Sequence, residues 1–189
     1  IARGESETGV TIMNISERMD TGDILLQRSL PISADDTGGS LHDKLSQLGA
    51  EALQAALALL KKGGLVGQPQ KEAEATYAPI IKKEDGRIDW ATDAVSIERR
   101  MRAFSPWPSV YTTFNGKLLK VFKARVETPG SRPILTPGAV AEVSPVHLLV
   151  ETGNGWLSLL EVQLEGKKRM SIEEFLRGHA IQRGTMLGA

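Results

Sequence analysis

The 189-residue sequence contains no cysteine, so disulfide bonds, cysteine-bound metals and cysteine-based redox chemistry are excluded. It has no run approaching the ~20 apolar residues that a membrane-spanning helix needs, and no signal peptide is recognisable. The three histidines, His42, His147 and His179, are scattered without metal-ligand spacing, so no metal site is expected. Glycine-rich nucleotide loops and the nucleophile motif of hydrolases are also missing. These absences favour a cytoplasmic protein that works without a metal or a membrane.

Equal numbers of basic and acidic residues, 23 of each, hide an asymmetry along the chain. Residues 1–80 carry 7 Lys and Arg against 11 Asp and Glu, which gives a net charge of −4. Residues 81–189 carry 16 against 12, which gives +4. A basic half joined to an acidic half indicates that one half meets a polyanion while the other half has a different task.

The first 63 residues have the pattern of two strands followed by a long amphipathic helix. An apolar strand over 10–15 leads through a polar loop into a turn at 20–23, and a second strand follows over 24–32. Leucines and alanines then recur at helical spacing after Ser40, the expected N-cap, which has Asp43 three residues on. This order is typical of an α/β sheet. The first strand lacks neighbours for a full parallel or mixed sheet, so we expect a partial α/β domain that is truncated at its N-terminus.

The rest of the chain has a different pattern. Residues 64–80 are rich in Gly, Pro, Gln and alternating charges, which predicts a linker over the surface. After residue 81 we expect a short helix over 93–104, several short strands, and a last helix that begins at Ser171. Asn115-Gly116 between two apolar runs is a strong hairpin signal. Short strands joined by tight turns favour a small β-barrel over 81–189.

Asp20 and Asp23, in the turn between the first two strands, are the remaining candidates for acid–base chemistry. A carboxylate on a loop between strands is a common way to hold a catalytic group on a rigid support. An aspartate at the start of a turn, however, more often accepts hydrogen bonds from its own turn. The residues alone leave both interpretations of Asp20 open, and they favour a structural role for Asp23.

Five segments, in order from one end of the chain to the other, resemble methionyl-tRNA formyltransferases. They are ETGVTIMNISERMDTGDILLQ, SLHDKLSQLGAEAL, TYAPIIKKEDGRIDW, RAFSPWPSVYT and LLEVQLEGKKRMS. The RIDW and PWP segments belong to the two-domain enzyme, whereas related folate-dependent formyltransferases match mainly the first half. The resemblance therefore covers both halves of the chain.

That resemblance implies a Rossmann-like catalytic domain over 1–63, a linker over 64–80 and an OB-like tRNA-binding domain over 81–189. The implied reaction moves a formyl group from 10-formyltetrahydrofolate to the amino group of initiator methionyl-tRNA in translation initiation. Asp20 matches the family's catalytic aspartate. The loop that wraps the folate ring is matched by Ser16, Glu17, Arg18 and Met19. The family's catalytic Asn and His would precede Ile1, so we expect this chain alone to be inactive.

Clusters of lysine and arginine in the second half suit the backbone phosphates of a folded RNA. The residues expected to bind tRNA are Lys82, Lys83, Arg87, Arg99, Arg100, Lys167, Lys168 and Arg169. Each cluster can equally be a solvated face, whereas Trp90 and Trp107 are expected to pack rather than to stack on bases.

Two rival functions stay open: an RNA-binding module without activity, and a related formyltransferase that acts on a small amine. We expect the protein to be a monomer.

Overall fold

The computed structural model describes residues 1–128 and 135–188, so residues 129–134 and 189 of the predicted second domain lie outside the described residues. The chain divides into two compact units. One unit is Glu5–Ile80, and the other is Ile81–Ala189 together with Ile1–Gly4. None of the helices in the described stretches of the chain is both long and apolar enough to cross a membrane.

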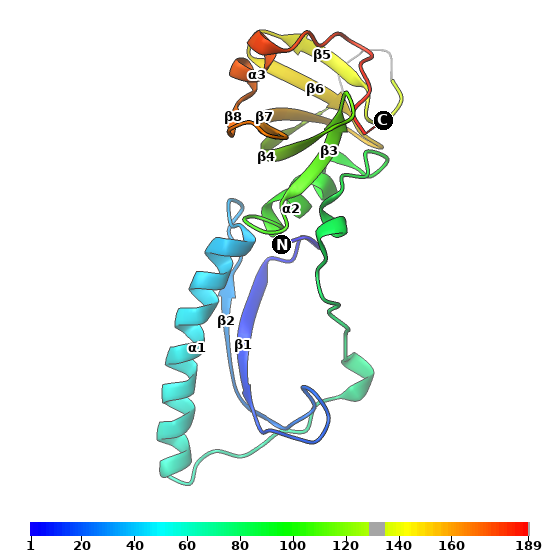
Figure 1. The fold of residues 1–189 in the computed structure, drawn as a ribbon. Helices are drawn as coiled ribbons and strands as arrows, with labels where there is room; N and C mark the ends of the chain where they lie inside the picture. Colours follow the sequence, from blue (N-terminus) through cyan, green and yellow to red (C-terminus); the bar gives the residue numbers. More distant parts are fainter. Residues whose placement is uncertain (129–134, 189) are drawn as a thin grey trace. The chain divides into compact units, whose positions relative to one another are not determined.

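The Glu5–Ile80 unit consists of a two-stranded antiparallel sheet and one long helix (Figure 1). Strand β1 (Glu7–Met13) pairs with β2 (Ile24–Pro31), and helix α1 (Gly38–Lys61) packs against both strands. The first strand therefore begins and ends earlier than predicted, and its partner is the next strand in the sequence. This arrangement leaves residues 14–23 as a loop at one end of the hairpin.

Helix α1 begins before the predicted N-cap, because Thr37 rather than Ser40 caps it. The Thr37 hydroxyl accepts a hydrogen bond from the Ser40 backbone N–H (3.1 Å), and the Ser40 hydroxyl accepts one from the Thr37 N–H (3.0 Å). The Ser40 hydroxyl also donates to the buried carboxylate of Asp36 (2.7 Å). Asp43, the expected partner of Ser40, has no role in this capping box.

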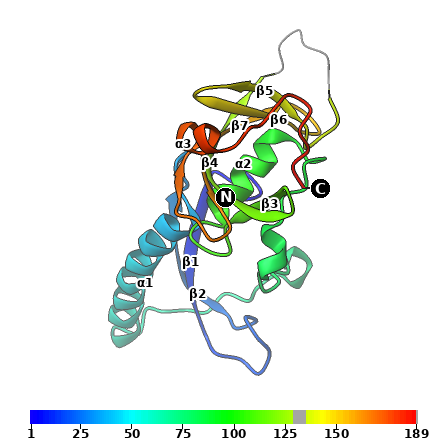
Figure 2. The same ribbon diagram turned by 45° about the horizontal axis from the view of Figure 1, so that its top comes forward.

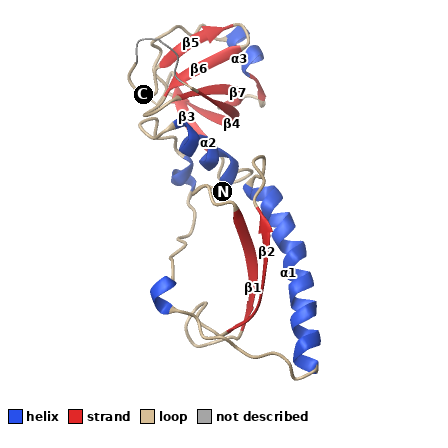
Figure 3. Ribbon diagram, turned by 180° about the vertical axis from the view of Figure 1, so that it is seen from behind, coloured by secondary structure: helices blue, strands red, loops and turns tan. Residues whose placement is uncertain are grey.

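Residues 62–80 return from the end of α1 and contain one short 3-10 helix, η1 (Glu72–Glu74) (Figure 3). Most of the segment is exposed, as predicted for a linker. It is nevertheless attached to the hairpin, because Gln68 and Ile24 exchange two backbone hydrogen bonds of 2.8 and 2.9 Å. The linker segment accordingly belongs to the Glu5–Ile80 unit.

The second unit begins with the 3-10 helix η2 (Lys83–Gly86) and helix α2 (Ala94–Ala103), and a six-stranded antiparallel sheet follows (Figure 2). The remaining elements are β3 (Val110–Phe114), β4 (Lys117–Glu127), β5 (Val140–Ser144), β6 (His147–Glu151), β7 (Trp156–Leu164), β8 (Met170–Ser171) and α3 (Ile172–Gly178). The strand order is β3-β4-β7-β6-β5, with β8 paired to β7.

The larger of two buried apolar clusters fills this unit, with side chains from α2, α3 and five of the strands. Leu119, Leu157 and Phe175 are completely inaccessible to solvent within it. The predicted closed barrel is not confirmed: among the described residues, the end strands β3 and β5 do not pair with each other. What the structure does have is a mostly antiparallel sheet that carries helices.

Local signals in this unit are largely confirmed. Asn115 (φ 50°) and Gly116 (φ 71°) join β3 to β4 as a two-residue hairpin turn, and Ser171 caps α3. Trp90 is buried and donates from Nε1 to the Thr112 hydroxyl at 3.1 Å, so the packing role predicted for it is confirmed. The same prediction is wrong for Trp107, which is 60% exposed.

Candidate functional site

The base of the loop at residues 14–23 is closed by the backbone. The Asn14 N–H donates to the Asp23 carbonyl oxygen at 3.0 Å. Gly22 is buried there, and a Cβ atom at this position would lie 1.7 Å from the Asn14 carbonyl oxygen. Only glycine therefore allows the two ends of the loop to approach so closely. Asp23 contributes through its backbone, which agrees with the structural role predicted for it.

The tip of the loop is organised around the carbonyl oxygen of Arg18. The Ser16 and Thr21 hydroxyls lie 2.9 and 3.0 Å from that oxygen and 2.8 Å from each other. Asp20 follows in the left-handed region, with φ 55°, which aspartate tolerates better than most residues. Its side chain is exposed, and no hydrogen bond or ion pair to its carboxylate occurs within residues 1–128 and 135–188. The loop thus presents this carboxylate outward rather than using it to cap the turn.

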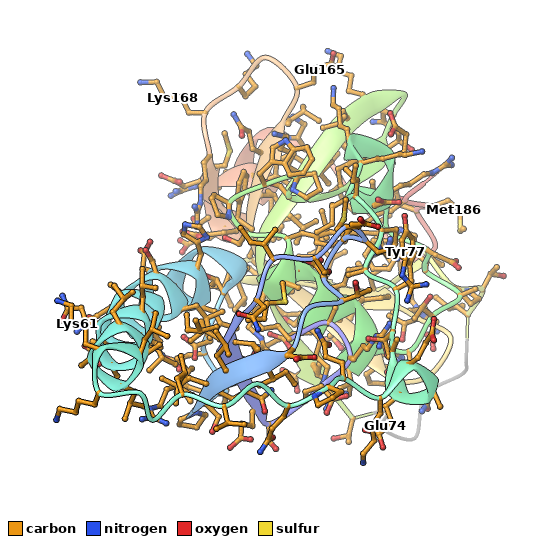
Figure 4. All side chains as sticks on the ribbon, turned by 90° about the horizontal axis from the view of Figure 1, so that it is seen from below. Lys61, Glu74, Tyr77, Glu165, Lys168 and Met186 are labelled. Carbon is orange, nitrogen blue, oxygen red and sulfur yellow. The ribbon has the colours of Figure 1, made fainter. Side chains whose placement is uncertain are left out.

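A pocket of about 710 Å³ lies between this loop and the linker segment. Arg18, Met19, Asp20 and Thr21 line it from the loop, and residues 68–72, 74 and 75 line it from the linker. The linker wall is visible near the labelled Glu74 in Figure 4. Of the predicted folate-contacting residues, Arg18 and Met19 are brought together with Asp20. Ser16 and Glu17 do not line the pocket, and Ser16 holds the loop instead.

Two polar side chains of the linker reach the loop. Gln70 donates from Nε2 to the backbone carbonyl oxygens of Asp20 (2.9 Å) and Gly22 (2.8 Å). Glu72 lies 3.4 Å from the Arg18 guanidinium, but both of these side chains are exposed, so the ion pair contributes little. Sequence reasoning missed Gln70 because a glutamine in a segment rich in Gly, Pro and Gln looks like a flexible spacer residue.

The first group of predicted tRNA-binding residues lies on η2 and α2. Lys82, Lys83 and Arg87 are exposed. Arg100 is partly buried, since its Nη2 donates to the Asp85 carbonyl oxygen at 2.5 Å and its guanidinium lies 5.2 Å from the centre of the Phe104 ring. Arg99 packs against the backbone at Gly4. Arg99 and Arg100 therefore have structural contacts, whereas the other three side chains are directed into solvent.

The second group lies on the turn between β7 and β8, where Lys167, Lys168 and Arg169 are all exposed. Lys168 is labelled in Figure 4 at this turn. Arg169 forms an ion pair with Glu161 and lies over the Phe122 ring, 4.5 Å from its centre.

The strand beside this turn adds two cations that sequence reasoning missed. Lys120 and Lys123 of β4 lie in register with Gln163 and Glu161 of β7. Both lysines follow the Asn115-Gly116 turn closely in the sequence. Their placement beside β7, where Glu161 pairs with Arg169, was not visible, because it depends on the pairing of β4 with β7.

Comparison with known proteins finds two family models in chain order. The model "Formyl transferase" matches residues 1–57, and the model "Formyl transferase, C-terminal domain" matches residues 80–180. Together they cover most of both units.

Curated relatives agree with these models. A methionyl-tRNA formyltransferase of Caldanaerobacter subterraneus subsp. tengcongensis is 48% identical over 99% of this chain, and one of Syntrophus aciditrophicus is 44% identical over all of it. The chain spans 60% of the length of each of these relatives. The family resemblance identified from the sequence is thereby confirmed.

Solved structures share the fold. HypX from Aquifex aeolicus, crystallised in complex with tetrahydrofolic acid, aligns with 97% of this chain and 35% of its own, with a TM-score of 0.63 and 22% identity. Because the C-terminal model alone matches more than half of the residues, and the first model precedes it in the expected order, the chain belongs to the formyl transferase family.

Proposed function

We propose that this chain belongs to a methionyl-tRNA formyltransferase, which moves a formyl group from 10-formyltetrahydrofolate to the amino group of initiator methionyl-tRNA. The names of the relatives support this proposal. The observation that carries it is the Asp20 loop, which lies within the segment matched by the formyl transferase model and opens on a pocket between the loop and the linker. Such an enzyme prepares the initiator tRNA for translation initiation, and we therefore place it in the cytoplasm.

The reaction has two proton requirements. The amino nitrogen of methionyl-tRNA attacks the formyl carbon, a C–N bond forms, and an oxyanion develops on the formyl oxygen. When the bond from the formyl carbon to the folate nitrogen breaks, the amine loses a proton and the folate nitrogen gains one. Hydrogen-bond donors aimed at the oxyanion lower the barrier.

Asp20 supplies the carboxylate in this scheme. A carboxylate beside a histidine keeps that ring charged, and it can order a water molecule that relays the proton. The resemblance assigns the oxyanion donors to an Asn and a His that have no counterpart in this sequence. The outward-facing Asp20 side chain and its left-handed backbone are suited to meeting groups supplied from elsewhere.

The folate ring is proposed to lie in the pocket beside Asp20. Arg18 and Met19 line that pocket and would contact the ring directly, while Ser16 and Glu17 belong to the same loop. Met19 is an exposed, adaptable apolar side chain, which suits the face of a pterin ring. The complex of HypX with tetrahydrofolic acid, a protein of the same fold, agrees with a folate substrate.

The second unit is proposed to bind the tRNA. This assignment completes an organisation in which residues 1–63 are catalytic, residues 64–80 form the linker and residues 81–189 form an OB-like RNA-binding domain. Exposed Lys82, Lys83 and Arg87 form one contact region for phosphates. The other region joins the turn at Lys167, Lys168 and Arg169 to Lys120 and Lys123 of β4. Arg99 and Arg100 would assist from α2.

Replacement of Asp20 tests the catalytic proposal in the complete protein. We expect Asp20→Asn to lower kcat by about 10²-fold or more, the usual range for loss of an acid–base group, while folate binding measured by fluorescence persists. Asp23→Asn is the matched control, because it alters the next carboxylate of the same loop and leaves the Asn14–Asp23 backbone hydrogen bond in place. Turnover near that of the wild type in Asp20→Asn would remove Asp20 from the mechanism.

Charge reversal tests the RNA surface. Lys82→Glu with Lys83→Glu should weaken tRNA binding and reduce the slope of log K against log salt concentration by about 0.7–0.9 for each phosphate that is no longer neutralised. Lys61→Glu with Lys62→Glu, at the end of α1, makes the same change in net charge outside the proposed surface. If the salt dependence is unchanged in Lys82→Glu with Lys83→Glu, the RNA-binding surface lies elsewhere on the molecule.

A further inference from the structure

Of the two linker side chains that reach the loop, Gln70 is the one that bonds to the loop backbone at Asp20. The Nε2 atom of Gln70 lies 2.9 Å from the carbonyl oxygen of Asp20 and 2.8 Å from that of Gly22. The two oxygens are on either side of Thr21, so the amide joins the backbone on both sides of the turn. Gln70 therefore fixes the portion of the loop that sets the direction of the Asp20 side chain.

The chemistry of these contacts determines the orientation of the Gln70 amide. Backbone carbonyl oxygens only accept hydrogen bonds, and the amide nitrogen of glutamine has two hydrogens to donate. Both hydrogens are used, so the alternative orientation would place an acceptor against two acceptors and lose both bonds. A glutamate at this position would have the same shape and would make that repulsive contact.

Gln70 can act as a support because its own segment is fixed. Two residues earlier, Gln68 exchanges two backbone hydrogen bonds with Ile24 of β2. The linker, the strand and the loop thus form a ring of contacts around the pocket. Asp20 needs such support, because a left-handed aspartate has lower-energy backbone conformations available to it.

We propose that Gln70 is a positioning residue for Asp20: it holds the loop backbone so that the carboxylate faces the reacting groups. The proposal rests on the proposed function, since it assigns Gln70 a role in the same reaction. It goes beyond that function by giving the linker a task in the catalytic half of the enzyme. Gln70 acts through the backbone of the loop, without chemistry of its own.

The test uses the complete protein with the variants Gln70→Ala and Gln70→Glu. Hydrogen exchange of the amides in residues 16–22 should become about tenfold faster in Gln70→Ala, the effect of losing hydrogen bonds of ordinary strength. The kcat for formyl transfer should fall about 10- to 100-fold, since small displacements of a catalytic group have effects of this size. Gln70→Glu should lose at least as much, although it has the same shape.

The control is Gln27→Ala, which removes another exposed amide hydrogen bond of the same unit, from Gln27 to the Thr11 hydroxyl (3.3 Å), and should change neither readout. Faster exchange together with a lower kcat, at an unchanged KM for methionyl-tRNA, supports the proposal. Unchanged exchange overturns it. A raised KM for folate with kcat intact also overturns it, because Gln70 would then bind folate directly.

The same experiment separates this proposal from the proposed function. If the wild-type protein transfers no formyl group to methionyl-tRNA, the proposed function fails, and the positioning role fails with it. If the wild-type protein is active and Gln70→Glu is as active as Gln27→Ala, only the positioning role fails.

Discussion

The two units differ in how they cover their apolar side chains. In the second unit, apolar side chains from both helices and five strands form one buried cluster. In Glu5–Ile80, the buried apolar residues among those described are Leu41, Ala52 and Ala56, all on α1. On the same helix, Leu53, Leu57 and Leu60 are 48, 49 and 59% exposed.

The two units bury different amounts of apolar surface because their helices cover sheets of different size. A helix on a two-stranded hairpin can cover only one stripe of its surface, and such a hairpin is marginally stable by itself. The sheet of the second unit encloses a core with α2 and α3. The Asp20 loop belongs to the first kind of structure, so its geometry depends on individual hydrogen bonds, from Asn14 to Asp23 and from Gln70.

The largest expected effect is a difference in cooperative unfolding between fragments of the two units. A fragment of residues 81–189 should unfold cooperatively in urea, with an m-value of roughly 1–3 kcal/mol per M. A fragment of residues 5–80 should show no cooperative transition, because it buries too little apolar surface to offset its conformational entropy. Circular dichroism and tryptophan fluorescence during urea titration measure the first fragment, and circular dichroism alone measures the second. A sharp transition in the 5–80 fragment would contradict this comparison.

Truncation of single leucines should sharpen the same contrast. Leu119→Ala, in the core of the second unit, should lower the free energy of unfolding of that unit by about 2–5 kcal/mol. Leu57→Ala, on the exposed side of α1, should change the stability of its own unit by about 0.5 kcal/mol or less. The measurement is urea unfolding of the full chain, followed separately for each unit by hydrogen exchange. Equal losses would mean that Leu57 is as well packed as Leu119.

Much of the fold follows from signals that act over a few residues. The recurrence of leucine and alanine defined α1, and Asn115-Gly116 defined the hairpin of β3 and β4. Ser171 capped the last helix as predicted, since a cap is formed within three residues of the chain. At the candidate site, the turn between two apolar runs made Asp20 a candidate in the same way, whereas its catalytic role was assigned only by the family resemblance.

The rest depends on contacts between distant residues. Ser40 had the right chemistry for a cap, but Thr37 and the buried Asp36 moved the start of α1. The support that Gln70 gives to the loop crosses 50 residues of sequence, and no local pattern announces it. The placement of Lys120 and Lys123 opposite Gln163 and Glu161 required the register of β4 and β7. Trp107 was expected to pack like Trp90, but its 60% exposure depends on which residues surround it in the folded chain.

The smallest expected effect concerns Asp36 in the Glu5–Ile80 unit. Its carboxylate is buried and accepts several hydrogen bonds. Hydrogen bonds from Lys44 (2.7 Å), Ser40 (2.7 Å) and the Ser33 N–H (2.9 Å) lower the pKa of Asp36 from 3.8 to about 2. A pKa lowered by folding contributes stability that is fully present above pH 3.8 and is lost as the pH falls towards 2. Asp36→Asn should therefore lower the temperature at which α1 melts in the full chain by a few degrees at pH 7.

The difference between Asp36→Asn and the wild type should then shrink as the pH is lowered from 4 to 3, since the Asp36 carboxylate of the unfolded chain takes up its proton there while that of the folded chain stays ionised. Asp35→Asn, at the exposed neighbouring position, is the matched control. It should leave the melting temperature unchanged at every pH between 7 and 3. Thermal unfolding of the full chain between pH 7 and 3 provides the measurement. A difference that stays constant over this range would show that Asp36 stabilises the start of α1 by its shape and not by its charge. The hairpin unit would then lack even this electrostatic support, and its contrast with the second unit would be greater.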